Sequence, residues 1–202
     1  MPEALKKLIH SISYLPGIGE KSASKLAFFL LNSNQNYIEN LKNDLVNIKD
    51  KIGSCEICHS LTDISQTQCS TCKNHSRDKY CIAIVQEYLD MISIEQSGSF
   101  DGVYHILGGA ISPINGVFVG DLNFNSLFDR IKISDKNIEL IIATNPNIEG
   151  EATTSYITEQ IAVKKLKHKV TITRLSRGLS SGYLEYADNI TLTNALKERK
   201  EI

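Results

Sequence analysis

Four cysteines in two closely spaced pairs constrain this chain more than any other feature. Cys55 and Cys58 form one Cys-x-x-Cys unit, and Cys69 and Cys72 form a second unit further along the chain. Each unit can present two thiolates to one metal ion, and two units complete a tetrahedral four-sulfur site. Because all four positions on the metal are then filled, we expect one structural zinc ion per chain.

The segment that holds these cysteines, 53–76, shows neither helical nor strand periodicity and is rich in Ser, Thr and Gln. Such a segment needs an external clamp to fold, and zinc supplies one. His59 and His75 are alternative ligands that a four-cysteine site does not need. The fifth cysteine, Cys81, opens an apolar run and is expected to be a buried small hydrophobic residue.

The N-terminal part of the chain is predicted to be helical. Apolar side chains recur at helical spacing in the stretches 5–12, 21–31 and 37–52. The first two stretches are joined by Pro16-Gly17-Ile18-Gly19, which breaks the helix. Glycines there let the backbone N–H groups approach an anion, and the N-terminus of the next helix adds positive potential.

This apolar-x-x-Leu-Pro-Gly-Ile-Gly pattern resembles a helix-hairpin-helix, a module that binds the nucleic-acid backbone without reading its sequence. Lys21 and Lys25 lie one helical turn apart and would flank a phosphate. We therefore expect DNA binding through Gly17, Gly19, Lys21 and Lys25. The alternative is an ordinary pair of packed helices joined by a glycine-rich turn.

From residue 79 onward, short apolar strands alternate with helical segments. The predicted strands are 80–85, 103–107, 139–143 and 170–173, and the predicted helices are 88–96, 122–131 and 150–165. Continuous apolar runs are typical of parallel strands buried on both faces. The alternation predicts a compact α/β domain with a mainly parallel sheet covered by helices, and a mixed α+β fold for the whole chain.

Acidic and amide residues follow two of these strands, where sites collect in α/β sheets. The arrangement resembles the Toprim domain of topoisomerases and primases, in which a Glu and an Asp-x-Asp pair hold magnesium. Glu87 matches the Glu, but Asn145 and Asn147 stand where the aspartates would be. Because amides neutralise little of a divalent cation's charge, we expect no catalysis here. The two asparagines are expected to serve as helix caps and turn residues.

The remaining carboxylates, Glu87, Glu149 and Glu151, would repel one another without a cation. An incoming basic surface would relieve that repulsion, so we expect Glu87, Asn145, Glu149 and Glu151 to contact a protein partner. The alternative for Glu87 is that it caps the helix beginning near Tyr88.

A basic stretch near the C-terminus is a second candidate for nucleic-acid contact. No acidic residue interrupts the chain between Glu159 and Glu185. Such a stretch is more often a solvated face. Its basic residues are Lys164, Lys165, Lys167, His168, Lys169, Arg174 and Arg177.

Together, and in this order, the motifs resemble those of the bacterial RecR recombination mediator family. Further family-like stretches are Gly98-Ser99-Phe100, 104–113, Thr144-Asn145-Pro146, 149–153 and 184–188. One departure lies at Leu179-Ser180-Ser181-Gly182-Tyr183, which is shorter than the family pattern and lacks its acidic residue.

The resemblance implies a DNA-binding repair protein that acts at single-stranded gaps and forms a ring-like homotetramer. It implies that the chain works with RecO, and in some cases RecF, to help RecA replace single-strand-binding protein. RecO is then the partner expected at Glu87. The sequence has no Gly-x4-Gly-Lys-Ser/Thr phosphate loop, and we expect no enzymatic activity. The alternative is a magnesium-dependent Toprim phosphotransferase or nuclease that uses Glu87, Glu149 and Glu151.

These motifs divide the chain into four parts. We expect a helix-hairpin-helix region at 1–53, a zinc finger at 54–76, a Toprim domain at 79–175 and a C-terminal segment at 176–202. The longest apolar run, Leu26 to Leu31, is too short to span a membrane, and the N-terminus lacks the features of a secretion signal. The net charge of −1 excludes a polybasic tail protein. We therefore expect a cytoplasmic protein.

Overall fold

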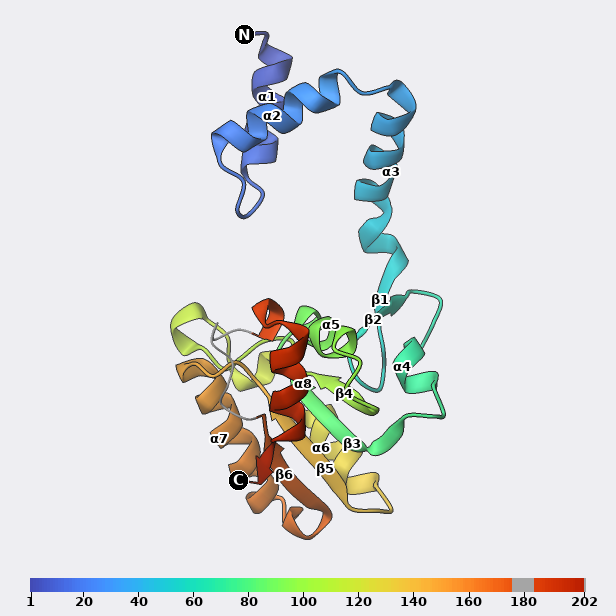
Figure 1. Ribbon diagram of the computed structural model, residues 1–202, viewed down its shortest axis with the longest axis vertical. Coiled ribbons are helices and arrows are strands. Elements are labelled where there is room, and N and C mark those ends of the chain that lie inside the picture. The colour runs from blue at the N-terminus through green and yellow to red at the C-terminus, as the bar shows by residue number, and fades with distance from the viewer. Residues whose placement is uncertain (176–183, 202) are drawn as a thin grey trace. The chain divides into compact units, whose positions relative to one another are not determined.

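The computed structural model of the chain describes residues 1–175 and 184–201. Contacts within the chain divide it into two compact units, Met1–Lys51 and Ile52–Ile202, which are described separately. Figure 1 shows the elements of both units. The sequence departure at 179–183 lies outside the residues that the structure describes.

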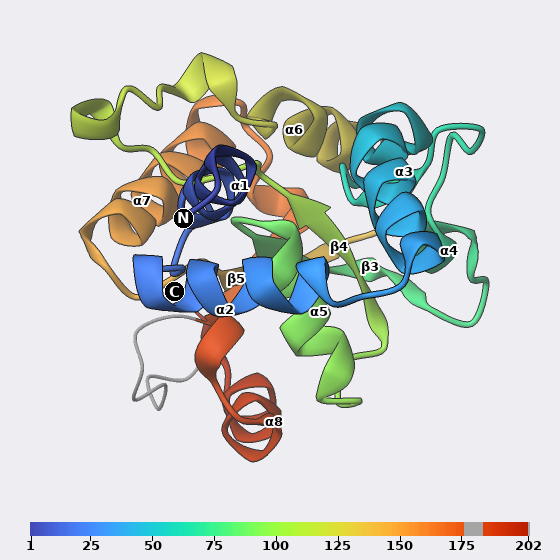
Figure 2. The same ribbon diagram turned by 90° about the horizontal axis from the view of Figure 1, so that it is seen from above.

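The first unit consists of three helices, as the apolar spacing predicts. They are α1 (Glu3–Ser13), α2 (Glu20–Leu31) and α3 (Gln35–Lys51). Helices α1 and α2 cross next to one another (Figures 1 and 2). Ala23 and Ala27 on α2 are completely buried. Their small side chains let a neighbouring helix approach α2 closely.

The second unit begins with the cysteine segment. Strands β1 (Ile52–Ser54) and β2 (Leu61–Asp63) form an antiparallel hairpin, and the short helix α4 (Ser70–Lys73) follows. The four cysteines form a buried cluster of their own, separate from the two hydrophobic cores of the unit. This arrangement agrees with a segment that folds around a metal rather than around apolar side chains.

A five-stranded sheet in the order β4-β3-β5-β6-β7 forms the centre of the second unit. Its first four strands pair in parallel, and β7 adds an antiparallel edge. The strands are β3 (Asp78–Val85), β4 (Gly102–Ile106), β5 (Ile138–Ala143), β6 (Val170–Arg174) and β7 (Lys200–Glu201). The mainly parallel sheet is confirmed.

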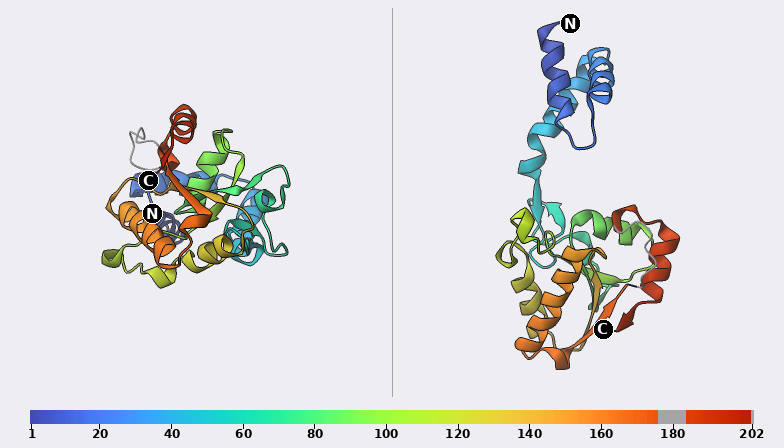
Figure 3. Two further views of the ribbon diagram at one scale, coloured as in Figure 1. Left: turned by 90° about the horizontal axis from the view of Figure 1, so that it is seen from below. Right: turned by 90° about the vertical axis from the view of Figure 1, so that its left-hand side faces the viewer.

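Helices cover both faces of this sheet. Alternate strand residues point to opposite faces, so Ile82 and Ile84 pack with α6 (Phe124–Ile133) and α7 (Ile148–Val163). Ala83 and Val85 pack with α5 (Tyr88–Gln96) and α8 (Asn189–Lys197) on the other face. The right-hand view of Figure 3 shows the strands between these two pairs of helices.

Two elements of the C-terminal segment are not among the elements that the sequence predicts. Helix α8 completes one face of the sheet, and β7 pairs with the outer edge of β6. Short 3₁₀ turns complete the unit at Pro113–Asn115, Val119–Asp121, Lys167–Lys169 and Leu184–Tyr186. None of the helices within residues 1–175 and 184–201 has the length and apolar character needed to cross a bilayer.

Candidate functional site

The four cysteine sulfurs form a compact, buried group. Their sulfur atoms all lie within 4.8 Å of one another, and Sγ of Cys58 lies 3.5 Å from Sγ of Cys69. In a tetrahedral zinc site, bonds of about 2.3 Å separate the sulfurs by about 3.8 Å. The four side chains are between 0 and 8% exposed. The group therefore fits one metal ion with no position open to water.

The local backbone of the segment orients these ligands. The N–H of Cys55 donates to the Ser60 carbonyl (2.8 Å), and the N–H of His59 donates to the Cys55 carbonyl (2.9 Å). The N–H of Cys72 lies 3.5 Å from Sγ of Cys69 and donates to it. Cys69 is also the N-cap residue of α4, a position that favours the thiolate form that binds metal.

The cysteine segment is attached to the sheet by polar contacts. The N–H of Ile106 at the end of β4 donates to the Cys58 carbonyl (2.8 Å), and His59 Nε2 lies 2.7 Å from Ser126 Oγ on α6. Arg130 on α6 donates to the Tyr104 carbonyl (2.9 Å). Burial lowers the pKa of Arg130, and the neighbouring cysteines oppose this shift. Arg130 is therefore a half-buried cation that links α6 to β4, a role that the sequence motifs do not reveal.

A glycine-containing loop joins α1 to α2, as the motif predicts. Gly17 has φ of +79°, a conformation that other residues rarely adopt. Gly19 is the N-cap of α2, and a Cβ atom there would meet no atom within 4 Å. Lys21 and Lys25 on α2 are exposed, and neither has an ion-pair partner among the described residues. The start of α2 thus offers backbone N–H groups and two lysines to an anion.

Asn145 follows β5 and holds three parts of the second unit together. Its side-chain amide donates to Gln86 Oε1 after β3, and its Oδ1 accepts the N–H of Leu184 (3.0 Å). Asn145 is 9% exposed. An aspartate at this position could not donate to Gln86 in its ionised form. Asn145, which stands where the Toprim resemblance places an aspartate, is therefore part of a structural hydrogen-bond network that includes the C-terminal turn Leu184–Tyr186.

Asn147 caps α7, as expected from the sequence. Its Oδ1 accepts the N–H of Gly150 at 2.8 Å. A Cβ atom on Gly150 would lie 1.9 Å from the Asn145 carbonyl oxygen, so only glycine fits there. The loop from Asn145 to Gly150 is therefore tightly packed.

Two of the three carboxylates at this edge of the sheet pair with side chains of other segments. Glu149 accepts hydrogen bonds from Ser112 and from Asn115 (3.0 Å). Glu151 forms a two-point ion pair with Arg174 on β6, with distances of 2.6 and 2.8 Å. The expectation of a self-repelling carboxylate cluster is therefore wrong for Glu149 and Glu151, because polar neighbours already compensate both.

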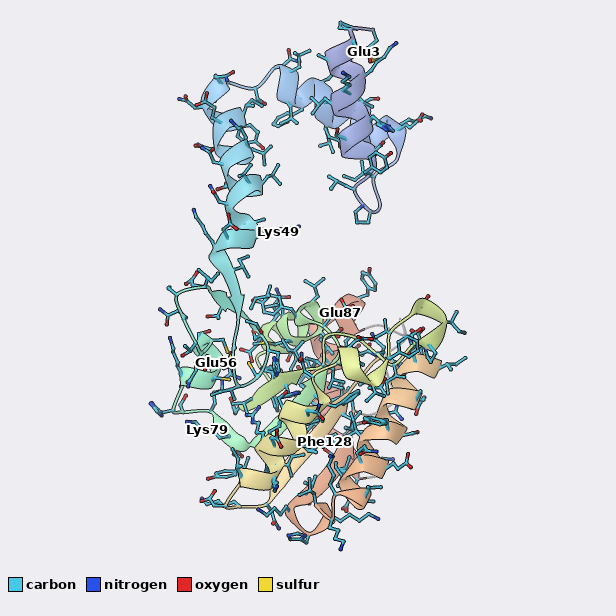
Figure 4. All side chains as sticks on the ribbon, turned by 180° about the vertical axis from the view of Figure 1, so that it is seen from behind. Glu3, Lys49, Glu56, Lys79, Glu87 and Phe128 are labelled. Atoms are coloured by element: carbon cyan, nitrogen blue, oxygen red, sulfur yellow. The ribbon has the colours of Figure 1, made fainter. Side chains whose placement is uncertain are left out.

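Glu87 lies at the end of β3, and its side chain is exposed (Figure 4). It is the N-cap residue of α5, and its backbone N–H donates to Asp90 at 2.9 Å. Glu87 therefore occupies the helix-capping position that we expected as its alternative role. Within the part of the chain that the structure describes, the cysteines form the only group of three or more potential ligands close enough to share a metal.

The structure changes the interpretation of two further residues. Arg174 belongs to the basic stretch of the sequence, but its ion pair with Glu151 engages it within the fold. Cys81 is half-buried rather than buried, and its sulfur lies 3.7 Å from Glu139. Burial raises the pKa of Cys81 to about 12, so it remains a thiol. Arg177 lies outside the described residues.

A helix pair joined by a glycine turn, a four-cysteine cluster and a mainly parallel sheet together define a Toprim-type protein with an N-terminal helix-hairpin-helix. Two family models match these parts of the chain. The model described as RecR, helix-hairpin-helix matches residues 5–49, and the Toprim domain model matches residues 80–176.

Curated relatives match over the full length of the chain. The recombination protein RecR of Natranaerobius thermophilus is 42% identical over 202 residues, covering 100% of this chain and 98% of the relative. The RecR proteins of Desulforapulum autotrophicum and Herpetosiphon aurantiacus are each 40% identical, covering 98% and 100% of this chain and 97% and 96% of the relatives. The chain belongs to the RecR family.

Proposed function

We propose that this protein acts in recombinational DNA repair as a non-enzymatic mediator. It binds DNA at single-stranded gaps and works with RecO, and where present RecF, to load RecA. Family membership over the whole chain is the observation that carries this proposal. The four parts expected from the sequence serve as its functional parts: DNA contact at 1–53, a zinc finger at 54–76, a Toprim domain at 79–175 and a C-terminal segment at 176–202.

DNA binding is assigned to the start of α2. The exposed Lys21 and Lys25, together with Gly17 and Gly19, support contact with phosphates rather than with bases. Such contacts hold the protein on DNA without sequence preference.

The test is the salt dependence of DNA affinity for the full chain and for the double variant Lys21→Ala/Lys25→Ala. Removing each lysine that binds a phosphate should lower the slope of log K against log salt by about 0.7–0.9. Lys6→Ala/Lys7→Ala on α1 is a matched control that removes the same charge. An unchanged slope in the α2 variant, with its folding intact, contradicts the assignment.

The metal is proposed to be one zinc ion held by Cys55, Cys58, Cys69 and Cys72. The short sulfur separations and the burial of all four side chains support it. The ion's contribution is structural, because four thiolates leave no position for water.

The edge of the sheet after β3 and β5 is proposed to contact RecO, through Glu87, Asn145, Glu149 and Glu151. Glu87 is the member of this set to test, because the other three are bound to distant segments of the fold, whereas Glu87 is exposed and caps only its own helix. Glu87→Gln should weaken RecO association most at low salt, while leaving thermal stability and zinc content unchanged. Lower stability with unchanged affinity would leave Glu87 with the capping role alone.

A ring-like homotetramer is also proposed. The unit Met1–Lys51 supports association with further copies, because neither α1 nor α3 has a buried residue. Large apolar side chains of this unit are exposed, including Phe29, Leu45 and Val46 at 58, 67 and 66%. Light scattering of the purified protein tests the stoichiometry, and a monomer at micromolar concentration would contradict it.

The competing function is a magnesium-dependent Toprim phosphotransferase or nuclease. Glu151 is paired with Arg174 and Asn145 with Gln86, which supports the non-enzymatic interpretation. A DNA nicking assay with and without magnesium separates the two. Magnesium-dependent cleavage that Glu87→Gln abolishes would support the enzyme.

A further inference from the structure

We propose that the edge of the sheet where the parallel strands begin carries a second contact surface for the nucleic-acid backbone. This proposal rests on the DNA-binding function proposed above and adds a site in the second unit. We call the surface the lysine edge and define it by its six lysines: Lys132, Lys136, Lys164, Lys165, Lys167 and Lys169.

The topology brings these lysines together from two separate segments. Strands β5 and β6 are parallel neighbours, so the segments that precede them lie at the same edge of the sheet (Figure 1). One segment is the C-terminal end of α6 with its following turn, and the other is 164–169. Lys169 Nζ joins them, donating to the carbonyls of Lys132 (2.9 Å) and Ser134 (2.8 Å).

A cavity lies within the lysine edge. It has a volume of about 360 Å³, and Lys132 and Lys164 both contribute to its wall. Lys164 Nζ is 5.3 Å from the centre of the ring of Phe128, which is labelled in Figure 4 and also lines the cavity. The other lining residues are Asn125, Asp129 and Leu166. Two lysines against one aspartate among the lining residues leave the cavity with a positive balance, which favours an anionic group such as a phosphate.

The charge of the lysine edge is concentrated although the chain as a whole carries −1. Within its two segments the one acidic residue is Asp135; Asp129 lies three residues before Lys132, and Glu139, three residues after Lys136, is paired with Arg199. Asp135 also accepts a hydrogen bond from Tyr80 (3.1 Å). The edge is therefore strongly positive, while exposed Glu87 lies at the opposite end of β3 (Figure 4).

The nucleic-acid backbone fits this surface better than a protein partner does. Duplex DNA presents one negative charge for about every 1.7 Å of its axis, so several phosphates meet a surface of this kind at once. The ammonium groups are point charges on flexible stems, which suit phosphates in many registers. The surface would contact DNA without reading its sequence.

The test compares two triple variants of the full chain. Lys132→Ala/Lys164→Ala/Lys167→Ala removes three exposed lysines from the edge, and Lys73→Ala/Lys197→Ala/Lys200→Ala removes three exposed lysines outside it in the same unit. Affinity for labelled single-stranded and duplex DNA of unrelated sequences is measured at several salt concentrations. Thermal melting checks that both variants are folded.

The edge variant should lower the salt slope by about 2–3, and the control variant should change it much less. An unchanged slope in the edge variant overturns the proposal, as does an equal decrease in the control. Unchanged DNA affinity with weaker RecO association would assign the edge to a protein and would also overturn it. If the unmodified chain binds no DNA, the proposed function itself fails, so the two failures are distinguishable.

Discussion

Replacing Asn145 by aspartate restores the residue type of a magnesium-binding Toprim site and tests what this position does here. In the structure the Asn145 amide donates to Gln86 and its oxygen accepts the N–H of Leu184. Asn145→Asp keeps the acceptor but removes the donor, and it places a carboxylate beside the Gln86 oxygen. We expect the variant to be less stable than the wild type.

The size of the effect follows from the two changes. Loss of the donated hydrogen bond costs about 1 kcal/mol, and an incompletely compensated buried carboxylate adds about 1–3 kcal/mol. For a unit of this size, a total of about 2–4 kcal/mol lowers Tm by roughly 4–16 °C. Burial raises the pKa of the new carboxyl above its unfolded value, so the folded state binds the proton more tightly. The deficit should therefore grow as pH rises from about 5 to 8.

Urea denaturation at both pH values, followed by circular dichroism, measures this deficit. Asn145→Ala is the matched control: it removes both hydrogen bonds without adding a charge, so its deficit relative to wild type should not change with pH. Equal stability of Asn145→Asp and wild type at pH 8 would refute the structural role. Magnesium-dependent cleavage of DNA by this variant would show that one carboxylate is enough to restore metal chemistry.

Three further predictions concern other parts of the fold. Cys58→Ala should lose stoichiometric zinc by elemental analysis and yield less soluble protein, whereas Cys81→Ala should retain the metal; a folded Cys58→Ala with full zinc would contradict the site. Gly150→Ala should cost about 3 kcal/mol or more, because its Cβ would lie 1.9 Å from the Asn145 oxygen; a melting curve like that of wild type would be inconsistent with this packing. Burial lowers the pKa of His105 to about 3, so the unfolded state binds its proton first as pH falls below about 6.5. The free energy of unfolding should then be about 2 kcal/mol lower at pH 5 than at pH 6.5 because of this one group. In His105→Gln this part of the decrease should be absent.

Much of the fold could be predicted because local patterns agree with the tertiary structure. The apolar runs at 80–85 and 139–143 become β3 and β5, since strands buried on both faces need no polar positions. The N-terminal helices follow from 3.6-residue spacing in the same way. The sequence also contains the features of helix α8. Asp188 is a capping residue that accepts the N–H groups of Ile190 and Thr191, and the apolar Leu192 and Leu196 lie four residues apart. Strand β7 has only two residues and no apolar pattern.

The parts of the site that could not be predicted from the sequence depend on contacts between distant segments. Gln86 and Leu184 meet Asn145 only because β3 and β5 are neighbours and the C-terminal turn returns to them. The pair Glu151–Arg174 likewise requires the pairing of β5 with β6, which the sequence does not specify. For that reason the sequence predicts Arg174 in a basic surface and does not predict its pairing with Glu151.

We propose that this chain promotes RecA loading without chemistry of its own. The most direct measurement follows RecA filament formation on gapped DNA coated with single-strand-binding protein, with purified RecO, in the presence and absence of the full chain. We expect faster filament formation that depends on RecO and is weakened by Lys21→Ala/Lys25→Ala, while the DNA remains uncut. No acceleration by a folded, zinc-loaded protein, or cleavage of the DNA, would contradict it.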